Sequence, residues 1–243
     1  MGKAKAKKQA HIKSNNSSNV VKLKTFLPTK SRSVNLTPRN RSQENYILEL
    51  INQDKNIVFG IGPAGTGKTM LACLSAVKAF LNGEVERIVV TRPAVSADED
   101  LGFLPGTLEE KMAPWTRPIF DVFREYFYAN EIEGMIKEGI IEISPLAYMR
   151  GRTFKDSFII ADEMQNATPN QMKMLLTRIG SGSKMVVTGD LNQADRLKDN
   201  GLLDFVNHLK NSKTSRISTV QFKHGDIERH AAVTEVLEVY GDA

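Results

Sequence analysis

Gly62-Pro63-Ala64-Gly65-Thr66-Gly67-Lys68-Thr69 (GPAGTGKT, residues 62–69) matches the pattern G-x-x-x-x-G-K-[ST] at every fixed position. The pattern predicts a loop whose backbone N–H groups surround phosphate oxygens, because glycine has no Cβ to block their approach. We expect Lys68 to reach the β- and γ-phosphates of ATP and Thr69 to bind Mg²⁺. An apolar run at 57–61 precedes the loop and helical spacing at 68–81 follows it, which is the strand–turn–helix context that such a loop requires.

A second group of candidate site residues ends another apolar run, at 158–161, where Asp162 and Glu163 follow each other. We expect Asp162 to hold Mg²⁺ through its water shell, and Glu163 to polarise the water that attacks ATP. Two acids at a strand end also commonly begin a helix. Their position downstream of a complete phosphate loop, with a strand between, favours the metal-and-water interpretation.

A polar segment, Thr188–Gln193, follows the apolar run at 184–188. In open α/β sheets, ligands bind at the carboxyl ends of the strands, where Asp190 and Gln193 would lie. We expect Gln193 to hydrogen-bond the γ-phosphate or the attacking water. The alternative is a polar turn without such a role.

The body of the chain alternates short β-rich runs with helical patterns, which predicts a mainly parallel sheet covered on both faces. The expected fold is a three-layer αβα P-loop NTPase. A strand at 87–91 lies between the loop and the acidic strand in the sequence. This order favours the additional-strand, RecA-like group of ATPases over P-loop kinases. The expected strands are 57–61, 87–91, 140–144, 158–161, 184–188 and 218–222, and the expected helices are 68–81, parts of 116–139, 169–179 and 227–240.

Charge divides the chain into a basic tail and a mildly acidic body, although its net charge is +5. Eleven basic residues precede Glu44, the first acid, and 22 basic against 28 acidic residues remain for the rest. Residues 1–40 are rich in Lys, Ser and Asn and poor in large apolar residues, which predicts a disordered tail before a domain at 41–243. Such a tail suits a polyanion such as nucleic acid, or it is a solvated extension without a fixed partner.

Cysteine content and hydropathy favour a cytoplasmic protein. The single cysteine, Cys73, excludes an internal disulfide framework and fits a reducing compartment. No apolar run approaches the ~18–20 residues that a membrane helix needs. We therefore expect no membrane association.

Seven motifs carry a resemblance to a known family, and the TRPAV, GFLPG and YMRGRTF segments among them are more specific than the phosphate loop. By these motifs the chain resembles the PhoH-like family, P-loop ATPases akin to the motor core of superfamily-one helicases. The motifs are GPAGTGKT (62–69), TRPAV (91–95), LGFLPG with EEKM and PW (101–115), AYMRGRTF (147–154), IIADEMQN (159–166), TGDLNQAD (188–195) and IERH (227–230).

The resemblance implies further roles. Gln43 is similar in position to an adenine-reading glutamine, unless it is only a polar residue that begins a helix. Arg92 resembles a contact to a nucleic-acid strand, with a helix cap or ion pair as the alternative. Arg229 resembles an arginine finger that acts on a neighbouring subunit, with a plain surface arginine as the alternative. Arg150 and Arg152 are rivals for the finger.

The resemblance also implies an activity and an assembly. We expect ATP binding and Mg²⁺-dependent hydrolysis, association with RNA or another single-stranded nucleic acid, and helicase-like movement. Nothing after residue 223 is long enough for a second motor domain, so a homo-oligomer is expected, with a hexameric ring as first choice. The alternatives are a nucleotide-dependent assembly or switch protein without a nucleic-acid substrate and, less favoured, a kinase.

Overall fold

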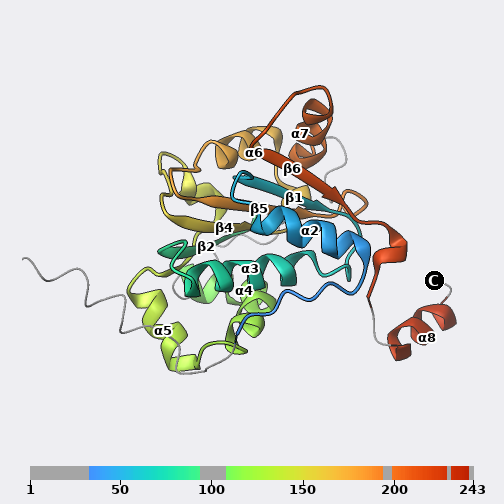
Figure 1. Ribbon diagram of the computed structural model, residues 1–243, viewed down its shortest axis with the longest axis horizontal. Coiled ribbons are helices and arrows are strands. Elements are labelled where there is room, and N and C mark those ends of the chain that lie inside the picture. Colours follow the sequence, from blue (N-terminus) through green and yellow to red (C-terminus); the bar gives the residue numbers. More distant parts are fainter. Residues whose placement is uncertain (1–32, 94–107, 194–198, 229–230, 241–243) are drawn as a thin grey trace, which may run out of the picture.

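A six-stranded sheet forms the centre of the molecule (Figure 1). The computed structural model describes residues 33–93, 108–193, 199–228 and 231–240. Within these residues every strand pair is parallel, in the order β3-β2-β4-β5-β1-β6. The strands are β1 (Ile57–Ile61), β2 (Arg87–Thr91), β3 (Ile141–Ile143), β4 (Ser157–Ala161), β5 (Lys184–Gly189) and β6 (Ile217–Gln221).

Helices cover both faces of this sheet, as the sequence predicts (Figure 1). One face carries α2 (Arg41–Ile51), α3 (Lys68–Leu81), α4 (Leu108–Arg124) and α5 (Ala129–Lys137). The other carries α6 (Pro169–Leu176) and α7 (Gly201–Lys210), with the short turns η1 (Leu146–Met149) and η2 (Met164–Asn166). The helical pattern at 116–139 therefore corresponds to two helices, α4 and α5.

The two apolar cores follow from the alternation of side chains along a strand. Val58 and Ile160 face the core under α3, whereas their neighbours Phe59 and Ile159 face the core under α6 and α7. All four side chains are fully buried. Strands buried on both faces carry continuous apolar runs, which is why these segments are apolar throughout.

The position of β5 confirms the additional-strand arrangement but corrects the reason for it. β5 pairs with β1 on one side and with β4 on the other, so it separates the loop strand from the acidic strand. The strand at 87–91 lies on the far side of β4. Order along the chain was therefore a poor guide, because parallel strands are joined by crossovers that reorder them.

The folded body begins before the predicted boundary at residue 41. Val34 is buried and Leu36 packs against the same core as α2 and α3. These two apolar side chains lie in the segment that the sequence analysis assigned to the tail. Residues 1–32 lie outside the described part of the chain.

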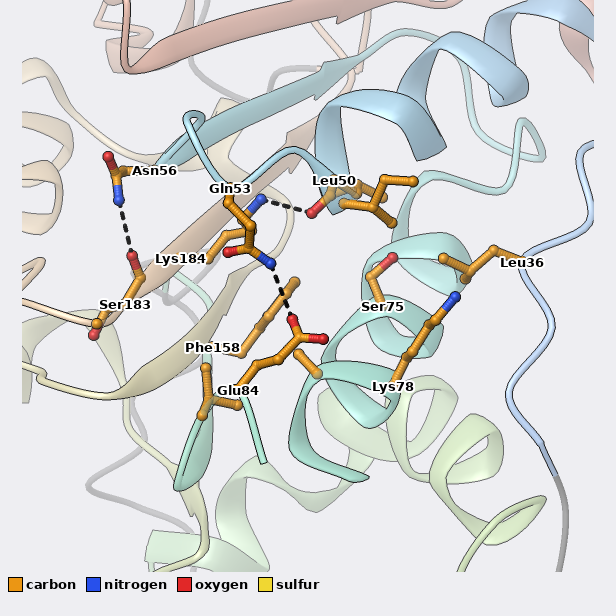
Figure 2. Close-up of a pocket in the computed structure, with 14 residues that line it drawn as sticks. Leu36, Leu50, Gln53, Asn56, Ser75, Lys78, Glu84, Phe158, Ser183 and Lys184 are labelled. Carbon is orange, nitrogen blue, oxygen red and sulfur yellow. Dashed lines mark hydrogen bonds between the residues drawn. The ribbon is translucent and has the colours of Figure 1, made fainter. Parts of the chain in front are cut away.

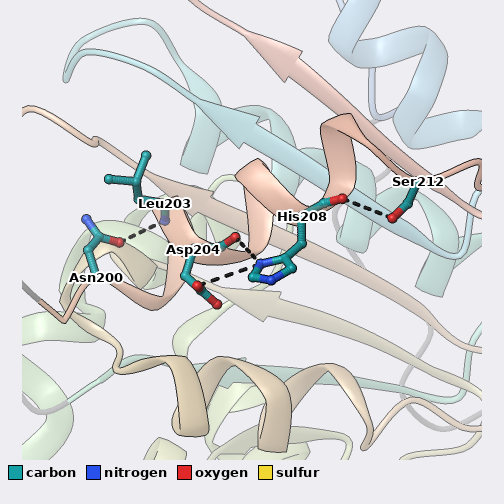
Figure 3. A network of polar contacts seen from close by, with 5 residues as sticks. All are labelled: Asn200, Leu203, Asp204, His208 and Ser212. Atoms are coloured by element: carbon teal, nitrogen blue, oxygen red, sulfur yellow. Dashed lines mark hydrogen bonds and ion pairs between the residues drawn. The ribbon is translucent and has the colours of Figure 1, made fainter.

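Helix α7 is fixed at its start by a polar cap (Figure 3). The buried Asn200 accepts a hydrogen bond from the Leu203 amide at 3.0 Å, and Gly201 donates its amide to the Ala167 carbonyl at 2.7 Å. Further along, the His208 ring lies 2.8 Å from the Asp204 carbonyl oxygen. A Cβ at Gly201 would lie 2.4 Å from the Thr168 carbonyl oxygen, so this close approach requires glycine.

The last helix, α8 (Ala231–Tyr240), is shorter than the predicted span 227–240 and lies away from the sheet (Figure 1). A short 3-10 turn, η3 (His224–Asp226), precedes it. Val233, Val236 and Val239 on α8 are exposed. Among the helices of the described residues, none is both long and apolar enough to cross a membrane.

Candidate nucleotide-binding site

The predicted phosphate loop and the predicted acids meet at the carboxyl edge of the sheet. The loop follows β1, the acids follow β4, and Asp190 follows the intervening β5. A cavity of about 150 Å³ lies between these three strand ends. It is lined by Ala64, Gly65, Lys68, Thr69, Asp162, Glu163, Gly189, Asp190 and Gln193.

The loop has the backbone shape that phosphate binding requires. Gly65 and Gly67 have φ of 83° and 81°, a region that residues with side chains rarely adopt. Gly62 is confined for a second reason, because a Cβ there would lie 2.5 Å from the Phe222 carbonyl oxygen. The loop then continues directly into α3, so the positive end of the helix dipole faces the cavity.

Lys68 folds back onto its own loop. Its ammonium donates to the carbonyls of Gly62 at 2.7 Å and Pro63 at 2.6 Å, and to Thr66 Oγ1 at 3.2 Å. Burial lowers the pKa of Lys68, and nearby carboxylates oppose this shift; they belong to Asp190, Glu163 and Asp162. An incoming phosphate would offer stronger, charged acceptors than the two carbonyls, so the ammonium is available to a ligand.

Asp162 joins the acidic strand to the phosphate loop. Its Oδ1 accepts hydrogen bonds from Thr69 Oγ1 at 2.7 Å and from Thr188 Oγ1 at 2.5 Å. A hydroxyl beside a carboxylate is the oxygen donor set that suits Mg²⁺, which binds few protein groups and keeps several waters. The residues present therefore fit the cation that such sites use, and Thr69 and Asp162 would hold it.

Glu163 follows Asp162 and has a left-handed backbone conformation, with φ 55° and ψ 38°, which residues other than glycine rarely adopt. Its Oε2 accepts a hydrogen bond from Gln165 Nε2 at 2.5 Å, and Gln165 Oε1 accepts from the Asp190 amide at 3.1 Å. Gln165 thus connects the carboxylate of one strand end to the backbone of the next. The sequence analysis did not select Gln165, although it lies within IIADEMQN, because one of its two partners, the Asp190 amide, is 25 residues away along the chain.

Gln193 lies where the sequence predicts, in the lining of the cavity. Its amide donates to the Asp190 carbonyl at 3.2 Å, which closes the turn after β5. The side chain is exposed and faces the same cavity as Lys68. Its expected contact with the γ-phosphate or the attacking water stays a prediction.

Gln43 braces the phosphate loop from behind. It is 1% exposed; its Nε2 donates to the Thr66 carbonyl at 3.1 Å and its Oε1 accepts from the Arg39 amide at 2.9 Å. Because the residue is almost fully buried, its side chain offers little surface to an adenine ring in this structure. The adenine contact stays a prediction, whereas the contact to the loop is present without a nucleotide.

Comparison with known proteins decides the family. The family profile described as "PhoH-like protein" matches residues 35–241. The chain belongs to the PhoH-like family. It is 48% identical over 204 residues to a PhoH-like protein of Bacillus subtilis, covering 83% of this chain and 63% of the relative. It is 39% identical over 206 residues to Protein PhoH of Escherichia coli, covering 83% and 57%.

A PhoH-like protein of Synechocystis is 43% identical over 219 residues, with 89% of this chain and 66% of the relative covered. The PhoH-like chain thus spans about 57–66% of the length of these three curated relatives. Among solved structures it is similar to the UvsW helicase of bacteriophage T4, with a TM-score of 0.46, 13% identity and coverage of 86% and 68%. It is also similar to the Pif1 helicase of Candida albicans, with a TM-score of 0.40, 15% identity and coverage of 85% and 44%.

The arginines predicted for the PhoH-like chain lie in different settings. Arg229 lies outside the described residues; the residue before it, Glu228, donates its amide to the Gly65 carbonyl at 3.0 Å. Arg152 is committed to its own chain, because both of its terminal nitrogens donate to the Glu142 carboxylate. Arg150 is exposed. Arg92 follows β2, and its buried Nε has no hydrogen-bond partner within the described residues.

A larger cavity of the PhoH-like chain lies at the opposite, amino edge of the sheet (Figure 2). Its volume is about 310 Å³, and Lys184 at the start of β5 lines it. The Lys184 ammonium donates to the carbonyls of Leu50 at 2.6 Å and Asn52 at 2.7 Å. Burial lowers the pKa of Lys184 to about 8, against the opposing effect of Glu84 and Glu49. None of the residues predicted to bind nucleotide lines this cavity, so its size does not identify it as the nucleotide site.

Proposed function

We propose that this chain binds ATP with Mg²⁺ and hydrolyses it. The observation that carries the proposal is the hydrogen bond from Thr69 Oγ1 to Asp162 Oδ1. This bond joins the phosphate loop to the acidic strand inside the cavity that Lys68 and Glu163 also line. A loop that only held a phosphate group, without catalysis, would not need the carboxylates of Asp162 and Glu163 in the lining of the same cavity.

Each residue of the site then has a chemical task. The loop amides and Lys68 bind the phosphates and stabilise the charge that develops on them. Mg²⁺, when bound, neutralises phosphate oxygens. Glu163 orients a water and accepts its proton, and Gln165 positions the Glu163 carboxylate. Water is favoured as the acceptor over a second substrate, because Glu163 and Gln193 both face the cavity.

We further propose that hydrolysis is coupled to RNA or another single-stranded nucleic acid. The basic composition of residues 1–41 and the helicase-like arrangement, with β5 between β1 and β4, support this coupling. A homo-oligomer, with a hexameric ring as first choice, would supply the second wall of a motor cleft. Its arginine finger would come from Arg229 or Arg150, since Arg152 is paired within its own chain.

The test is the rate of phosphate release by the full-length protein, with and without a single-stranded RNA. We expect hydrolysis that depends on Mg²⁺, that RNA accelerates and that Lys68→Ala abolishes. Absence of release under all these conditions would contradict the proposal. Transfer of labelled phosphate to an acceptor other than water would favour a kinase instead.

A second candidate function is a nucleotide-dependent assembly switch without a nucleic-acid substrate. The exposed valines of α8 favour it, because an uncovered apolar helix face suits a protein partner. Sizing of the protein with ATP, with ADP and without nucleotide separates the two functions. A switch changes its assembly with the nucleotide and has no affinity for RNA.

A further inference from the structure

One exposed aromatic side chain lies on an anchored turn at the carboxyl edge of the sheet. Tyr148 belongs to the turn η1, which follows β3, and its side chain is 64% exposed. The same turn is anchored by Leu146 and Met149, which are 2% and 0% exposed. A large side chain on an anchored turn loses little conformational freedom when a partner binds, which favours a binding role.

Arginines surround the segment that continues from this turn. Arg150 is exposed, and no hydrogen bond or ion pair holds it within the described part of the chain. Arg178 donates through Nη1 to the Arg152 carbonyl at 3.1 Å. The Arg152 guanidinium lies over the Phe154 ring at 4.6 Å and pairs with Glu142.

We call Tyr148, Arg150, Arg152 and Arg178 the η1 patch. Among the ion pairs of the described residues, the patch has one, between Arg152 and Glu142, so it holds three guanidinium groups and one carboxylate. This balance is the reverse of the body as a whole, where 22 basic residues oppose 28 acidic ones. A local positive excess on an acidic body, with an aromatic side chain in it, is the composition of a surface that binds single-stranded nucleic acid.

The turn η1, with Tyr148, lies at the same edge of the sheet as the nucleotide cavity. Arg152 and Arg178 extend the patch toward the amino end of β4, because Phe154 donates its amide to the Arg178 carbonyl at 2.9 Å shortly before that strand begins. Leu146 donates its amide to the Arg92 carbonyl at 3.5 Å, which joins η1 to the end of β2. β2 in turn pairs with β4, whose end carries Asp162. Two strand spacings of ~4.8 Å separate β3 from β4, so the strand that leads into η1 lies roughly 10 Å along the sheet from the strand that ends at the acids.

A physical route joins the two places. α6 packs against η1, and α6 is connected through η2 to Glu163. A ligand that shifts η1 therefore acts on a helix that is joined through η2 to Glu163, the carboxylate proposed to activate water. This route does not pass through the phosphate loop.

We propose that the η1 patch binds single-stranded nucleic acid, with a base stacked on Tyr148 and backbone phosphates paired with Arg150. The inference rests on the proposed coupling to nucleic acid and names the surface that performs it. The phosphates of a nucleic-acid strand would pair with the arginines, and one of its bases would stack on the exposed ring. An acidic protein segment would pair with the arginines but would offer the ring no base to stack on.

The experiment measures binding of a fluorescent oligouridine 12-mer to the full-length protein by anisotropy, with Mg²⁺ and ADP present. Tyr148→Ala should weaken binding about 5- to 150-fold, because stacking of one base contributes ~1–3 kcal/mol. Tyr148→Phe, which keeps the ring, should stay within about twofold of wild type. Arg150→Ala should lower the slope of log affinity against log salt by about 0.7 for each phosphate that the arginine neutralises in wild type.

The matched control is Tyr240→Ala, which removes another exposed tyrosine, 78% exposed against 64% for Tyr148, from α8. It should leave the affinity unchanged. Thermal melting of each variant excludes unfolding, and Tyr148→Phe keeps the test informative if Tyr148→Ala is unstable. A DNA oligomer of matching sequence separates RNA from DNA as the source of the strand. Binding of either oligomer that Tyr148→Ala and Arg150→Ala weaken supports the proposal.

The outcomes are distinguishable. If wild type binds the oligomers and the Tyr148→Ala and Arg150→Ala variants bind equally well, the η1 patch is overturned and the coupling to nucleic acid stands. If wild type binds neither oligomer, the coupling fails and the patch fails with it. If Arg150→Ala slows hydrolysis without nucleic acid and leaves affinity and salt slope unchanged, Arg150 is the finger and the patch is overturned.

Discussion

At the residue scale, Glu163 combines a proposed chemical role with an unusual backbone. A left-handed backbone conformation at a non-glycine residue costs on the order of 1–3 kcal/mol, and such residues cluster at functional sites. Here the neighbouring contacts hold it: Gln165 bonds its carboxylate, and Asn166 donates its amide to the Glu163 carbonyl at 3.2 Å. The strain places the carboxylate at the cavity instead of along the helix that follows.

Glu163→Gln should separate binding from chemistry. The amide cannot accept the proton of water, so we expect phosphate release to fall by roughly 10²-fold or more. ATP affinity, which the loop and Lys68 supply, should stay near that of wild type. Titration with a fluorescent ATP analogue checks the affinity, and Lys68→Ala, which should lose binding itself, is the contrasting variant. Equal loss of binding in both would refute this division of roles.

Gln165→Ala should slow hydrolysis through misplacement of the carboxylate, not through loss of nucleotide. We expect phosphate release to fall by about 10- to 100-fold, the usual range for a residue that positions a catalytic group through a hydrogen bond. Gln165→Glu is the conservative comparison: it keeps the acceptor for the Asp190 amide but sets two carboxylates together. It should therefore raise the pH at which hydrolysis reaches half its maximum. A pH profile that is identical in all three proteins would contradict the positioning role.

At the element scale, α7 offers a test of the fold that is independent of catalysis. Asn200→Ala removes the cap of α7 and should lower the free energy of unfolding by about 1 kcal/mol. Asn211→Ala, at the other end of the same helix, removes no side-chain cap and should change it little. Urea unfolding followed by circular dichroism measures both. If Asn211→Ala lowers the free energy of unfolding as much as Asn200→Ala does, the loss of the cap does not explain the effect.

Elements were predicted well where one local rule decided them. The runs 57–61 and 87–91 and the helix 68–81 coincide with β1, β2 and α3, because an apolar run buried on both faces and a glycine-rich turn are local signals. The sheet order was not a local property, so the position of β5 came from the structure. The same holds for the bond from the Asp190 amide to Gln165 and for the bond from Thr188 to Asp162, because each joins residues that follow or end different strands. Val34 and Leu36 were missed because two apolar side chains in a polar segment give no periodic pattern.

At the scale of the whole molecule, Lys184 predicts a dependence of stability on pH. Its pKa in the folded chain is about 8, below the usual 10.5, so between these values the unfolded chain binds more protons. The free energy of unfolding therefore gains a contribution that increases as pH rises from about 8 towards 10.5. Lys184→Met should lack this contribution. Urea titrations of both proteins at several pH values measure it, and parallel curves would contradict a buried, destabilised ammonium.

The account as a whole depends on one cation that the phosphate loop and the acidic strand bind together. Its most direct test is the affinity for Mn²⁺, in place of Mg²⁺, of the ATP-loaded Glu163→Gln protein, read by electron paramagnetic resonance. We predict a tight site that Asp162→Asn, added to the same protein, weakens by about 10- to 100-fold. If the Asp162→Asn protein holds Mn²⁺ as tightly as its parent while ATP is bound, the acidic strand does not serve the nucleotide and the account is wrong.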